Sequence, residues 1–254
     1  MNSYKAYLID LDGTMYKGLE PIDGAAEFVQ RLCAKSIPYL FVTNNSSISP
    51  EKLADKLNQM GIQAGKENIF TSSMATAEYI DSLKSKSSVF MIGEEGLREA
   101  LVHKGLSLVT KNADFVTIGI DRKITYEKLA DACLEIRNGA KLISTNKDAA
   151  IPTERGMVPG NGAMTSVLAV STGVSPVFVG KPEPILMEQA VEKLGFPKSD
   201  TLMIGDNYDT DIMAGIKAGI DTLMVETGIS TRESIRSHNK QPTYHAKNLT
   251  EWEV

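Results

Sequence analysis

The sequence predicts an α/β fold with a parallel sheet and a second α/β domain inserted into it. Short apolar runs typical of strands alternate with helical patterns along almost the whole chain. This alternation is characteristic of a parallel sheet with helices on both faces. Two polar stretches interrupt it, and the segment between them has strand and helix patterns of its own. The 254 residues are enough for one large domain or two smaller ones.

The expected strands are short runs rich in branched and aromatic residues. They cover residues 5–9, 39–43, 89–92, 115–118, 142–145, 177–179, 202–204 and 222–225. Helices are expected where apolar residues recur every three or four positions. This spacing occurs in Ala25/Phe28/Leu32, Leu53/Leu57/Met60 and Leu129/Cys133/Ile136. Ser49-Pro50-Glu51 adds a helix start, because it combines an N-cap residue, a proline and an acid.

The two polar stretches define the expected domain boundaries. The first is the serine- and lysine-rich segment 82–88, and the second lies near residues 172–176. We therefore expect a core formed by residues 1–83 and 177–254, and an inserted domain of residues 84–176. Within the insertion, residues 146–162 are expected to be a long irregular loop that lines a binding site.

Composition narrows the classes of function. The net charge is −5 and there is no basic block, which argues against non-specific binding of nucleic acid. No apolar run is long enough to span a bilayer, and the first residues lack the apolar region of a leader peptide. Cys33 and Cys133 lie far apart on apolar helical stripes, so buried free thiols and a cytoplasmic location are expected.

The most informative motif is Asp10-Leu11-Asp12-Gly13-Thr14, which ends the first expected strand. Side chains two positions apart on a strand point the same way, so Asp10 and Asp12 are expected to lie together. Two such anions need a nearby cation, which implies a divalent metal. Gly13 allows a sharp turn whose free N–H can face an anion. The alternative is that Asp-Gly is only a turn after a strand.

Three further strand ends carry polar residues: Thr43-Asn44, Lys181 and the segment from Asp206 to Asp211. Each alone has an ordinary explanation as a turn, a helix cap or a solvated lysine. Ligands of open parallel sheets bind beyond the carboxyl ends of the strands, where all of these residues fall. Together they supply a nucleophile, a proton donor and acceptor, charge neutralisation and metal ligands. Phosphoryl transfer requires this set.

Taken in order from Asp10 to Asp211, these four motifs resemble those of the haloacid dehalogenase-like (HAD) phosphatase superfamily. The resemblance covers essentially the whole chain. It is closest to the NagD-like phosphatases and nitrophenylphosphatases, which carry a large α/β cap of the C2 type between the second and third motifs. The resemblance therefore implies a Rossmann-like core with an inserted α/β cap.

The resemblance also implies a role for each motif residue. Asp10 corresponds to the nucleophile that becomes an aspartyl phosphate, and Asp12 to the general acid and base. Mg²⁺ would be held by the Asp10 side chain, the Asp12 backbone carbonyl and Asp206. The phosphoryl-binding groups would be Thr43, the Asn44 backbone and Lys181. Supporting positions would be Gly13, Asn207 and Asp211, with Asp211 near the metal or orienting Lys181; Asp209 is interpreted as a helix cap.

The implied activity is Mg²⁺-dependent hydrolysis of small organic phosphate monoesters, such as sugar phosphates or nucleoside monophosphates. Two alternatives remain: a phosphotransferase or phosphomutase of the same superfamily, and a non-enzymatic phospho-receiver module. Mutases of the superfamily usually carry a smaller cap after the first motif, and a receiver is about half this length. In the cap, Asn146 and Asp148 are candidates for substrate specificity. The sequence leaves the oligomeric state open, with a homodimer formed through the cap as one option.

Overall fold

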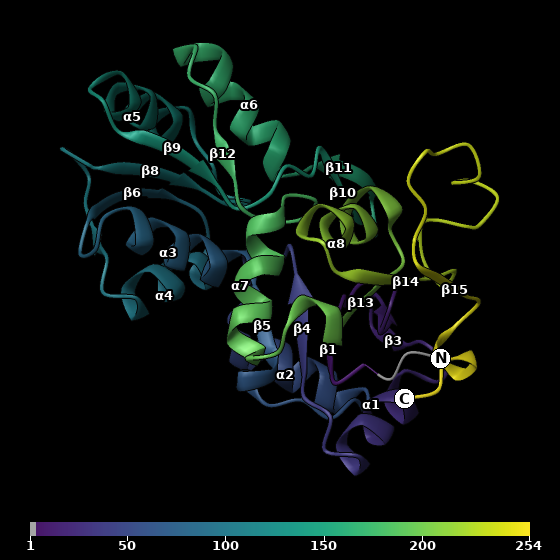
Figure 1. Cartoon of the computed structure of the whole chain (residues 1–254). Coiled ribbons are helices and arrows are strands. Elements are labelled where there is room, and N and C mark those ends of the chain that lie inside the picture. Colours follow the sequence, from purple (N-terminus) through teal and green to yellow (C-terminus); the bar gives the residue numbers. More distant parts are fainter. Residues whose placement is uncertain (1–3) are drawn as a thin grey trace. The chain divides into compact units, whose positions relative to one another are not determined.

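The computed structural model describes residues 4–254 and has the expected α/β fold (Figure 1). The described chain divides into two compact units. The first unit contains residues 4–43, 50–70 and 181–254, and the second contains residues 44–49 and 71–180. Each unit has its own sheet and its own helices.

The first unit is built on a six-stranded sheet. Its order is β15 (Tyr244–Ala246), β14 (Asp221–Val225), β13 (Thr201–Gly205), β1 (Ala6–Ile9), β4 (Tyr39–Thr43) and β5 (Ile69–Thr71). The strands from β15 to β4 pair in parallel, with Ile9 of β1 opposite Ile204 and Phe41. This register brings the carboxyl ends of β1, β4 and β13 to one edge of the sheet.

The helices of the first unit are α1 (Ala25–Ala34), α2 (Pro50–Gln59), α7 (Pro184–Leu194) and α8 (Met213–Ala218). Short helical turns follow or precede strands: η1 (Lys66–Asn68), η2 (Lys198–Asp200), η3 (Tyr208–Ile212) and η4 (Leu249–Glu251). Helix α7 packs against α8 and lies on β4 and β1 (Figure 1). Tyr7 and Phe28 are fully buried, with an edge-to-face ring contact of 5.8 Å between centroids.

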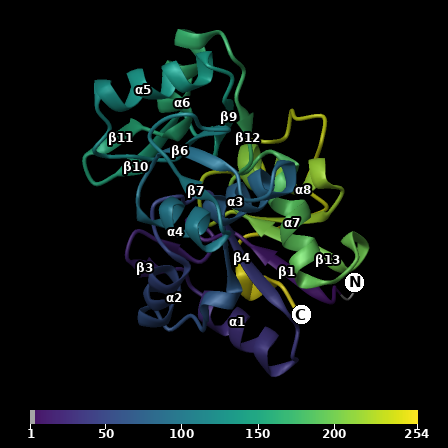
Figure 2. The ribbon, with the colours of Figure 1, turned by 90° about the vertical axis from the view of Figure 1, so that its left-hand side faces the viewer.

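The second unit contains a five-stranded parallel sheet. Its order is β12 (Val177–Phe178), β9 (Lys141–Ser144), β8 (Phe115–Ile118), β6 (Ser88–Ile92) and β7 (Ser107–Leu108). Helices α5 (Tyr126–Arg137) and α6 (Asn161–Thr172) pack together on one face. Helices α3 (Ser72–Leu83) and α4 (Glu95–His103) pack together on the other face (Figure 2).

The expected strands all occur, each within one residue of its expected limits. The three expected helical patterns are α1, α2 and α5, and α2 begins at Pro50 as expected. Strands β5, β7 and β15 were not predicted, nor was the hairpin of β2 (Tyr16–Lys17) and β3 (Glu20–Pro21). These strands are two or three residues long, too short to show a hydrophobic period.

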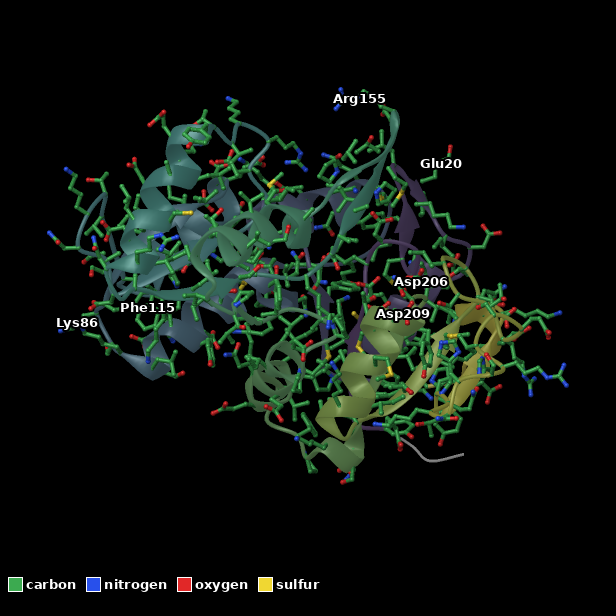
Figure 3. The ribbon with its side chains drawn as sticks, turned by 90° about the horizontal axis from the view of Figure 1, so that it is seen from above. Glu20, Lys86, Phe115, Arg155, Asp206 and Asp209 are labelled. Atoms are coloured by element: carbon green, nitrogen blue, oxygen red, sulfur yellow. The ribbon has the colours of Figure 1, made fainter. Side chains whose placement is uncertain are left out.

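The expectation of an irregular loop over residues 146–162 was wrong. Strands β10 (Ala150–Thr153) and β11 (Gly156–Pro159) form an antiparallel hairpin there, and α6 begins at Asn161. Arg155 lies at the turn of this hairpin (Figure 3), where the Thr153 hydroxyl donates to the Gly156 carbonyl at 2.8 Å. Proline and glycine, which suggested a loop, are accommodated because this is an isolated two-stranded ribbon.

The limits of the second unit also differ from the expected boundaries at residues 84 and 176. The unit includes α3, because α3 packs against α4, so the polar segment 82–88 joins α3 to β6 inside one unit. The unit extends to Gly180, because β12 pairs with β9 instead of joining the six-stranded sheet. That the two units act as a core and a cap stays a prediction.

Both cysteines are free thiols, as expected, but they are half-buried and not fully buried. The Cys33 sulfur lies 3.8 Å from the Tyr39 hydroxyl. Among the described helices, none has the length and apolar character needed to cross a bilayer. The expected cytoplasmic location stays a prediction.

Candidate active site

Asp10 directly follows β1 at the edge where the carboxyl ends of three strands align. Its backbone N–H donates to the Ile204 carbonyl at 2.9 Å, which continues the pairing of β1 with β13 past the end of the strand. The residue is 7% exposed, so its carboxylate is almost fully removed from water. Thr43 ends the neighbouring strand β4 and is also buried.

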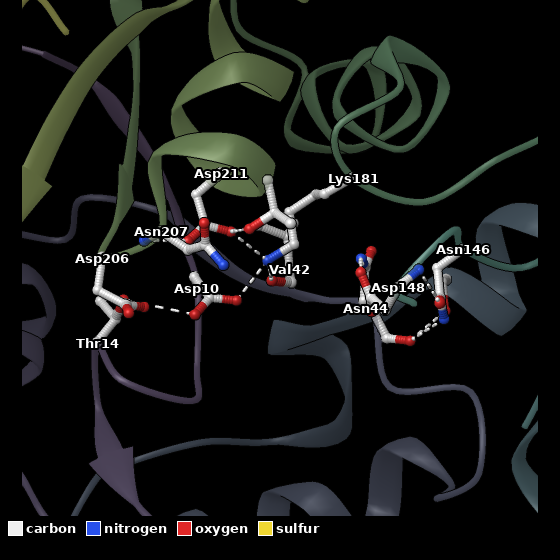
Figure 4. A network of polar contacts seen from close by, with 12 residues as sticks. Asp10, Thr14, Val42, Asn44, Asn146, Asp148, Lys181, Asp206, Asn207 and Asp211 are labelled. Carbon is white, nitrogen blue, oxygen red and sulfur yellow. Dashed lines mark hydrogen bonds and ion pairs between the residues drawn. The ribbon is translucent and has the colours of Figure 1, made fainter. Parts of the chain in front are cut away.

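Lys181 is the positive centre of the first unit's site (Figure 4). Its Nζ forms ion pairs with Asp10 and, at 2.7 Å, with Asp211. It also donates to the Val42 carbonyl at 3.1 Å, and its side chain is 3% exposed. The reading of Lys181 as an ordinary solvated lysine is therefore wrong.

Asp206 follows β13 and is held by groups from two loops. One oxygen accepts from the Ile229 N–H at 2.8 Å, and the other accepts from the Thr14 hydroxyl at 3.1 Å. Thr14 also lies 3.4 Å from Asp10, so its hydroxyl spans both carboxylates. Gly13 has a φ of +92°, and a Cβ there would lie 2.5 Å from an Asp206 oxygen. The glycine is thus required by both the turn and the close approach of Asp206.

Asp211 and Asn207 belong to the turn that follows β13. One Asp211 oxygen accepts from the Asn207 N–H at 3.0 Å, while the other pairs with Lys181. The interpretation of Asp209 as the helix cap was wrong. Asn207 is the N-cap of η3, because its side-chain oxygen accepts from the Asp209 N–H at 3.0 Å. Asp209 itself is exposed, and Figure 3 labels it together with Asp206.

The carboxylates of this site fit a divalent cation. Asp10, Asp206 and Asp211 are all buried, and each offers one oxygen within 4.8 Å of the others. Lys181 balances only one of them, so two negative charges are uncompensated when all three are ionised. Oxygen ligands carrying excess negative charge suit a hard cation such as Mg²⁺. The cluster contains Asp211 in addition to the expected Asp10 and Asp206, whereas the Asp12 side chain is not part of it.

The pKa values reflect this crowding. Burial raises the pKa of the Asp10 carboxyl well above its usual range, the nearby Asp211 charge raises it further, and Lys181 opposes both. Burial and Asp211 raise the pKa of Asp206 to about 6 against the lowering effect of the Ile229 N–H. Burial alone would lower the pKa of Lys181, but Asp10 and Asp211 outweigh it and hold the pKa above its usual value. The site therefore disfavours its full negative charge in the absence of a cation.

Asp12 differs from Asp10 in its surroundings. Its side chain is exposed, although partial desolvation raises the pKa of its carboxyl and the Lys56 ammonium opposes that rise. Lys56 Nζ lies 3.8 Å from the centre of the Tyr16 ring, and Tyr16 is paired with Asp12 through an isolated β-bridge. Asp12 is thus a solvent-accessible carboxyl with a raised pKa, which suits a proton donor.

The remaining candidate residues lie together in the second unit. Asn44 directly follows Thr43, and its side-chain nitrogen lies 3.2 Å from each carboxylate oxygen of Asp148. The Asn146 side-chain nitrogen donates to the Asn44 carbonyl at 2.9 Å (Figure 4). The structure therefore connects all three residues by hydrogen bonds.

Several groups that complete the site were not predicted from the sequence. Thr14 stands in the first motif, but no role was assigned to its hydroxyl, and the Val42 carbonyl has no sequence signature. The loop after β14 was also missed: Thr227 Oγ1 donates to the Gly13 carbonyl at 2.7 Å, and Ile229 contacts Asp206. Its position after a predicted strand was an available indication, because ligand sites collect at such ends.

The comparisons with known proteins agree with this geometry. Residues 7–107 match a family model described as haloacid dehalogenase-like hydrolase, and residues 178–252 match one described as HAD-hydrolase-like. A 5'-nucleotidase of Bacillus subtilis, YutF, is 60% identical over 99% of this chain and 98% of its own length. The chain belongs to the haloacid dehalogenase-like hydrolases.

Further relatives define its class within this family. An acid sugar phosphatase of Staphylococcus aureus is 55% identical over 99% of this chain and 97% of its own. A double-mutant thermostable NPPase from Geobacillus stearothermophilus has a TM-score of 0.94 at 56% identity, covering 100% of this chain and 99% of that one. A p-nitrophenyl phosphatase from Archaeoglobus fulgidus has a TM-score of 0.92 at 36% identity, and the match covers 98% of this chain and 97% of that one. The protein is accordingly a phosphatase of this family, similar to NagD-like phosphatases.

Proposed function

We propose that this phosphatase hydrolyses small organic phosphate monoesters through a covalent aspartyl phosphate on Asp10, with Mg²⁺ as its metal. The observation that carries the proposal is the buried Asp10 carboxylate, paired with Lys181 and surrounded by Asp206 and Asp211. Such a cluster holds one carboxylate in place as a nucleophile, and its uncompensated negative charge can be neutralised by a divalent cation.

In the first step, an Asp10 carboxylate oxygen attacks phosphorus and forms a new O–P bond. The bond from phosphorus to the leaving oxygen breaks, and Asp12 gives that oxygen its proton. In the second step, Asp12 takes a proton from water, whose oxygen attacks phosphorus. The Asp10–phosphorus bond then breaks, which releases inorganic phosphate and restores both carboxyl groups to their starting states.

Other residues of the chain hold the phosphoryl group and the nucleophile. The Lys181 ammonium binds a phosphoryl oxygen and fixes Asp10, while Asp211 fixes Lys181 through their 2.7 Å ion pair. The Thr43 hydroxyl and the Asn44 backbone N–H bind the remaining phosphoryl oxygens. Asp10, Asp206 and the Asp12 carbonyl would hold Mg²⁺, with Asp211 close by. When bound, the metal reduces the repulsion between the anionic nucleophile and the anionic phosphoryl group.

Nucleoside monophosphates and sugar phosphates are the proposed substrate classes. The names of two relatives, a 5'-nucleotidase and an acid sugar phosphatase, support them. Both classes share the phosphoryl group that Lys181, Thr43 and the Asn44 backbone would bind, and they differ in the leaving alcohol.

Phosphate release from a panel of such esters tests the proposal, using the parent and Asp10→Asn. The variant removes the nucleophile at nearly constant shape, so we expect turnover to fall at least about 1,000-fold. Asp209→Asn is the matched control, since Asp209 is an exposed aspartate of the same turn as Asp211, and it should retain parental rates. Substantial activity in Asp10→Asn would rule out the covalent mechanism.

A further inference from the structure

We propose that Asn146 and Asp148 are positioning residues, which hold the peptide between Thr43 and Asn44 in place and thereby set the turnover of every phosphate ester alike. The inference rests on the proposed function, because it takes this peptide to bind the phosphoryl group. It differs from the sequence-based expectation that Asn146 and Asp148 select among leaving groups.

The Asn146 side chain forms hydrogen bonds to other residues of the second unit. It is 4% exposed, so a substrate has little access to it. Its side-chain nitrogen donates to the Asn44 carbonyl at 2.9 Å, and its side-chain oxygen accepts from the Asp148 N–H at 3.2 Å. Both polar atoms of this amide are therefore engaged in holding other parts of the chain.

Asp148 and Ser72 hold Asn44 from other directions. The Asn44 side-chain nitrogen lies 3.2 Å from both Asp148 oxygens, and the Ser72 hydroxyl donates to the Asn44 carbonyl at 2.8 Å. Asn44 is thus fixed at its side chain and at its carbonyl. The anchored carbonyl belongs to the peptide between Asn44 and Asn45, and together with the fixed side chain it restricts the backbone rotation of Asn44, which sets the direction of the Asn44 N–H.

The segment that carries Asn146 is itself anchored to α6. The buried Asn161, the first residue of that helix, donates to the Asn146 carbonyl at 2.9 Å and to the Ser144 hydroxyl at 2.9 Å. Ser144 also donates to the Asn146 carbonyl, at 3.0 Å. These contacts make the end of β9 a fixed support for Asn44.

The same segment also contacts Gly180, the residue that directly precedes Lys181. The Gly180 N–H donates to the Thr145 carbonyl at 2.8 Å. A Cβ on Gly180 would lie 2.5 Å from the Thr145 carbonyl oxygen and 2.6 Å from the Asn44 side-chain oxygen. The residues that directly follow Thr43 and directly precede Lys181 are therefore packed on one support. Peptide continuity transmits a displacement of this support to both phosphoryl-binding positions, and such displacements are costly to catalysis.

Alanine substitutions at these two positions test the proposal. For Asn146→Ala and Asp148→Ala we expect kcat to fall about 10- to 100-fold on p-nitrophenyl phosphate, a sugar phosphate and a nucleoside monophosphate. The ratios of kcat/KM among the three esters should stay within about twofold, and the inhibition constant of inorganic phosphate should rise by a similar factor for both variants. Matched controls are Asn138→Ala and Asp131→Ala, exposed residues of the same unit, which should behave as the parent.

Two further variants keep the test independent of misfolding. Asp148→Asn keeps one acceptor oxygen for Asn44, so it should recover most of the activity lost in Asp148→Ala. The double alanine variant should lose less than the product of the two single losses, because both residues act through Asn44.

Changed ratios among the esters would overturn the proposal in favour of substrate selection. A lower melting temperature with unchanged kcat and unchanged phosphate inhibition would overturn it in favour of a purely structural role. Failure of the proposed function is a separate result, because it would appear as an active Asp10→Asn variant regardless of the behaviour of Asn146 and Asp148.

Discussion

Lys181 is the residue on which the charge balance of the first unit's site depends. It is buried between Asp10 and Asp211, and it is the cation that pairs with both of them. Removing one partner from a buried ionic cluster is costly, because the remaining charges stay buried without compensation. Substitution of Lys181 is therefore expected to reduce both stability and catalysis.

Lys181→Met should lower the free energy of unfolding by about 3–5 kcal/mol in metal-free protein. It should also abolish turnover of all esters, because they share the phosphoryl group. Adding Asp211→Asn should restore part of the stability, since it removes one of the unpaired carboxylates, without restoring activity. Urea denaturation of the single and double variants measures these changes in the free energy of unfolding. Lys217→Met, which breaks an exposed pair with Glu183, should cost less than about 1 kcal/mol.

Alanine substitutions at Gly13 and Gly18 distinguish the effect of backbone strain from the effect of crowding in the site. Both have positive φ, but a Cβ on Gly13 would lie 2.5 Å from Asp206, whereas a Cβ on Gly18 would meet nothing within 4 Å. Gly13→Ala should therefore displace Asp206 and reduce kcat by about 100-fold or more. Gly18→Ala should cost about 1–2 kcal/mol of stability and retain activity. Equal activity in the two variants would contradict the role assigned to the close approach of Gly13 and Asp206.

At the scale of elements, β15 carries a histidine whose titration should be visible in stability. Burial lowers the pKa of His245, the Arg232 charge lowers it further, and Glu226 opposes them. Its Nδ1 is buried and has no hydrogen-bond partner among the described residues. The unfolded chain therefore binds a proton at His245 at a higher pH than the folded chain does.

The contribution of His245 to the free energy of unfolding should accordingly decrease as the pH falls through about 6.5, the usual histidine value, toward the lower pKa of the folded protein. The raised pKa of Asp206 acts in the opposite direction over the same range, so the difference between parent and variant isolates the histidine. His245→Gln should reduce this slope, as measured by urea denaturation at several pH values between about 5 and 8. A parental slope in His245→Gln would show that another group causes the dependence.

The elements also show where sequence patterns stop being informative. Strands such as β1 and β4 were predicted because their apolar runs are fully buried, and burial is what the hydrophobic pattern reports. The hydrophobic pattern could not show to which of the two sheets β12 belongs. Its pairing with β9 depends on contacts between distant residues, Val177 with Ile143 and Phe178 with Ser144, which no local pattern encodes.

At the scale of the whole molecule, the grouping of charged residues in the first unit could be predicted because these residues stand at or just after strand ends. Asp10, Asp206, Asp211 and Lys181 were found in this way, and the structure brings them together. Backbone groups such as the Val42 carbonyl and the Ile229 N–H could not be found, because every residue has them. The partners of Asn146 and Asp148 were likewise invisible, since a sequence does not show which polar side chains are already satisfied.

Metal dependence is the next expectation for the whole molecule. Exhaustive chelation should abolish turnover, Mg²⁺ should restore it, and Ca²⁺ should restore it poorly because it prefers more ligands at longer distances. Mg²⁺ should also raise the melting temperature of the parent by mass action, and this rise should be much smaller in Asp206→Asn. Asp200→Asn, in a partly exposed surface pair with Lys5, is the matched control. Full activity after chelation would contradict the proposed metal site.

The central claim is that the phosphoryl group passes through Asp10, and trapping that intermediate tests it most directly. Asp12→Ala should form the aspartyl phosphate from p-nitrophenyl phosphate, whose good leaving group needs no proton, but should hydrolyse it slowly without a base to activate water. After acid quenching and digestion, mass spectrometry should find one phosphoryl group on the peptide that contains Asp10. The label should be absent from Asp10→Asn/Asp12→Ala. A phosphoryl group on another residue, or none despite release of p-nitrophenol, would contradict the covalent mechanism.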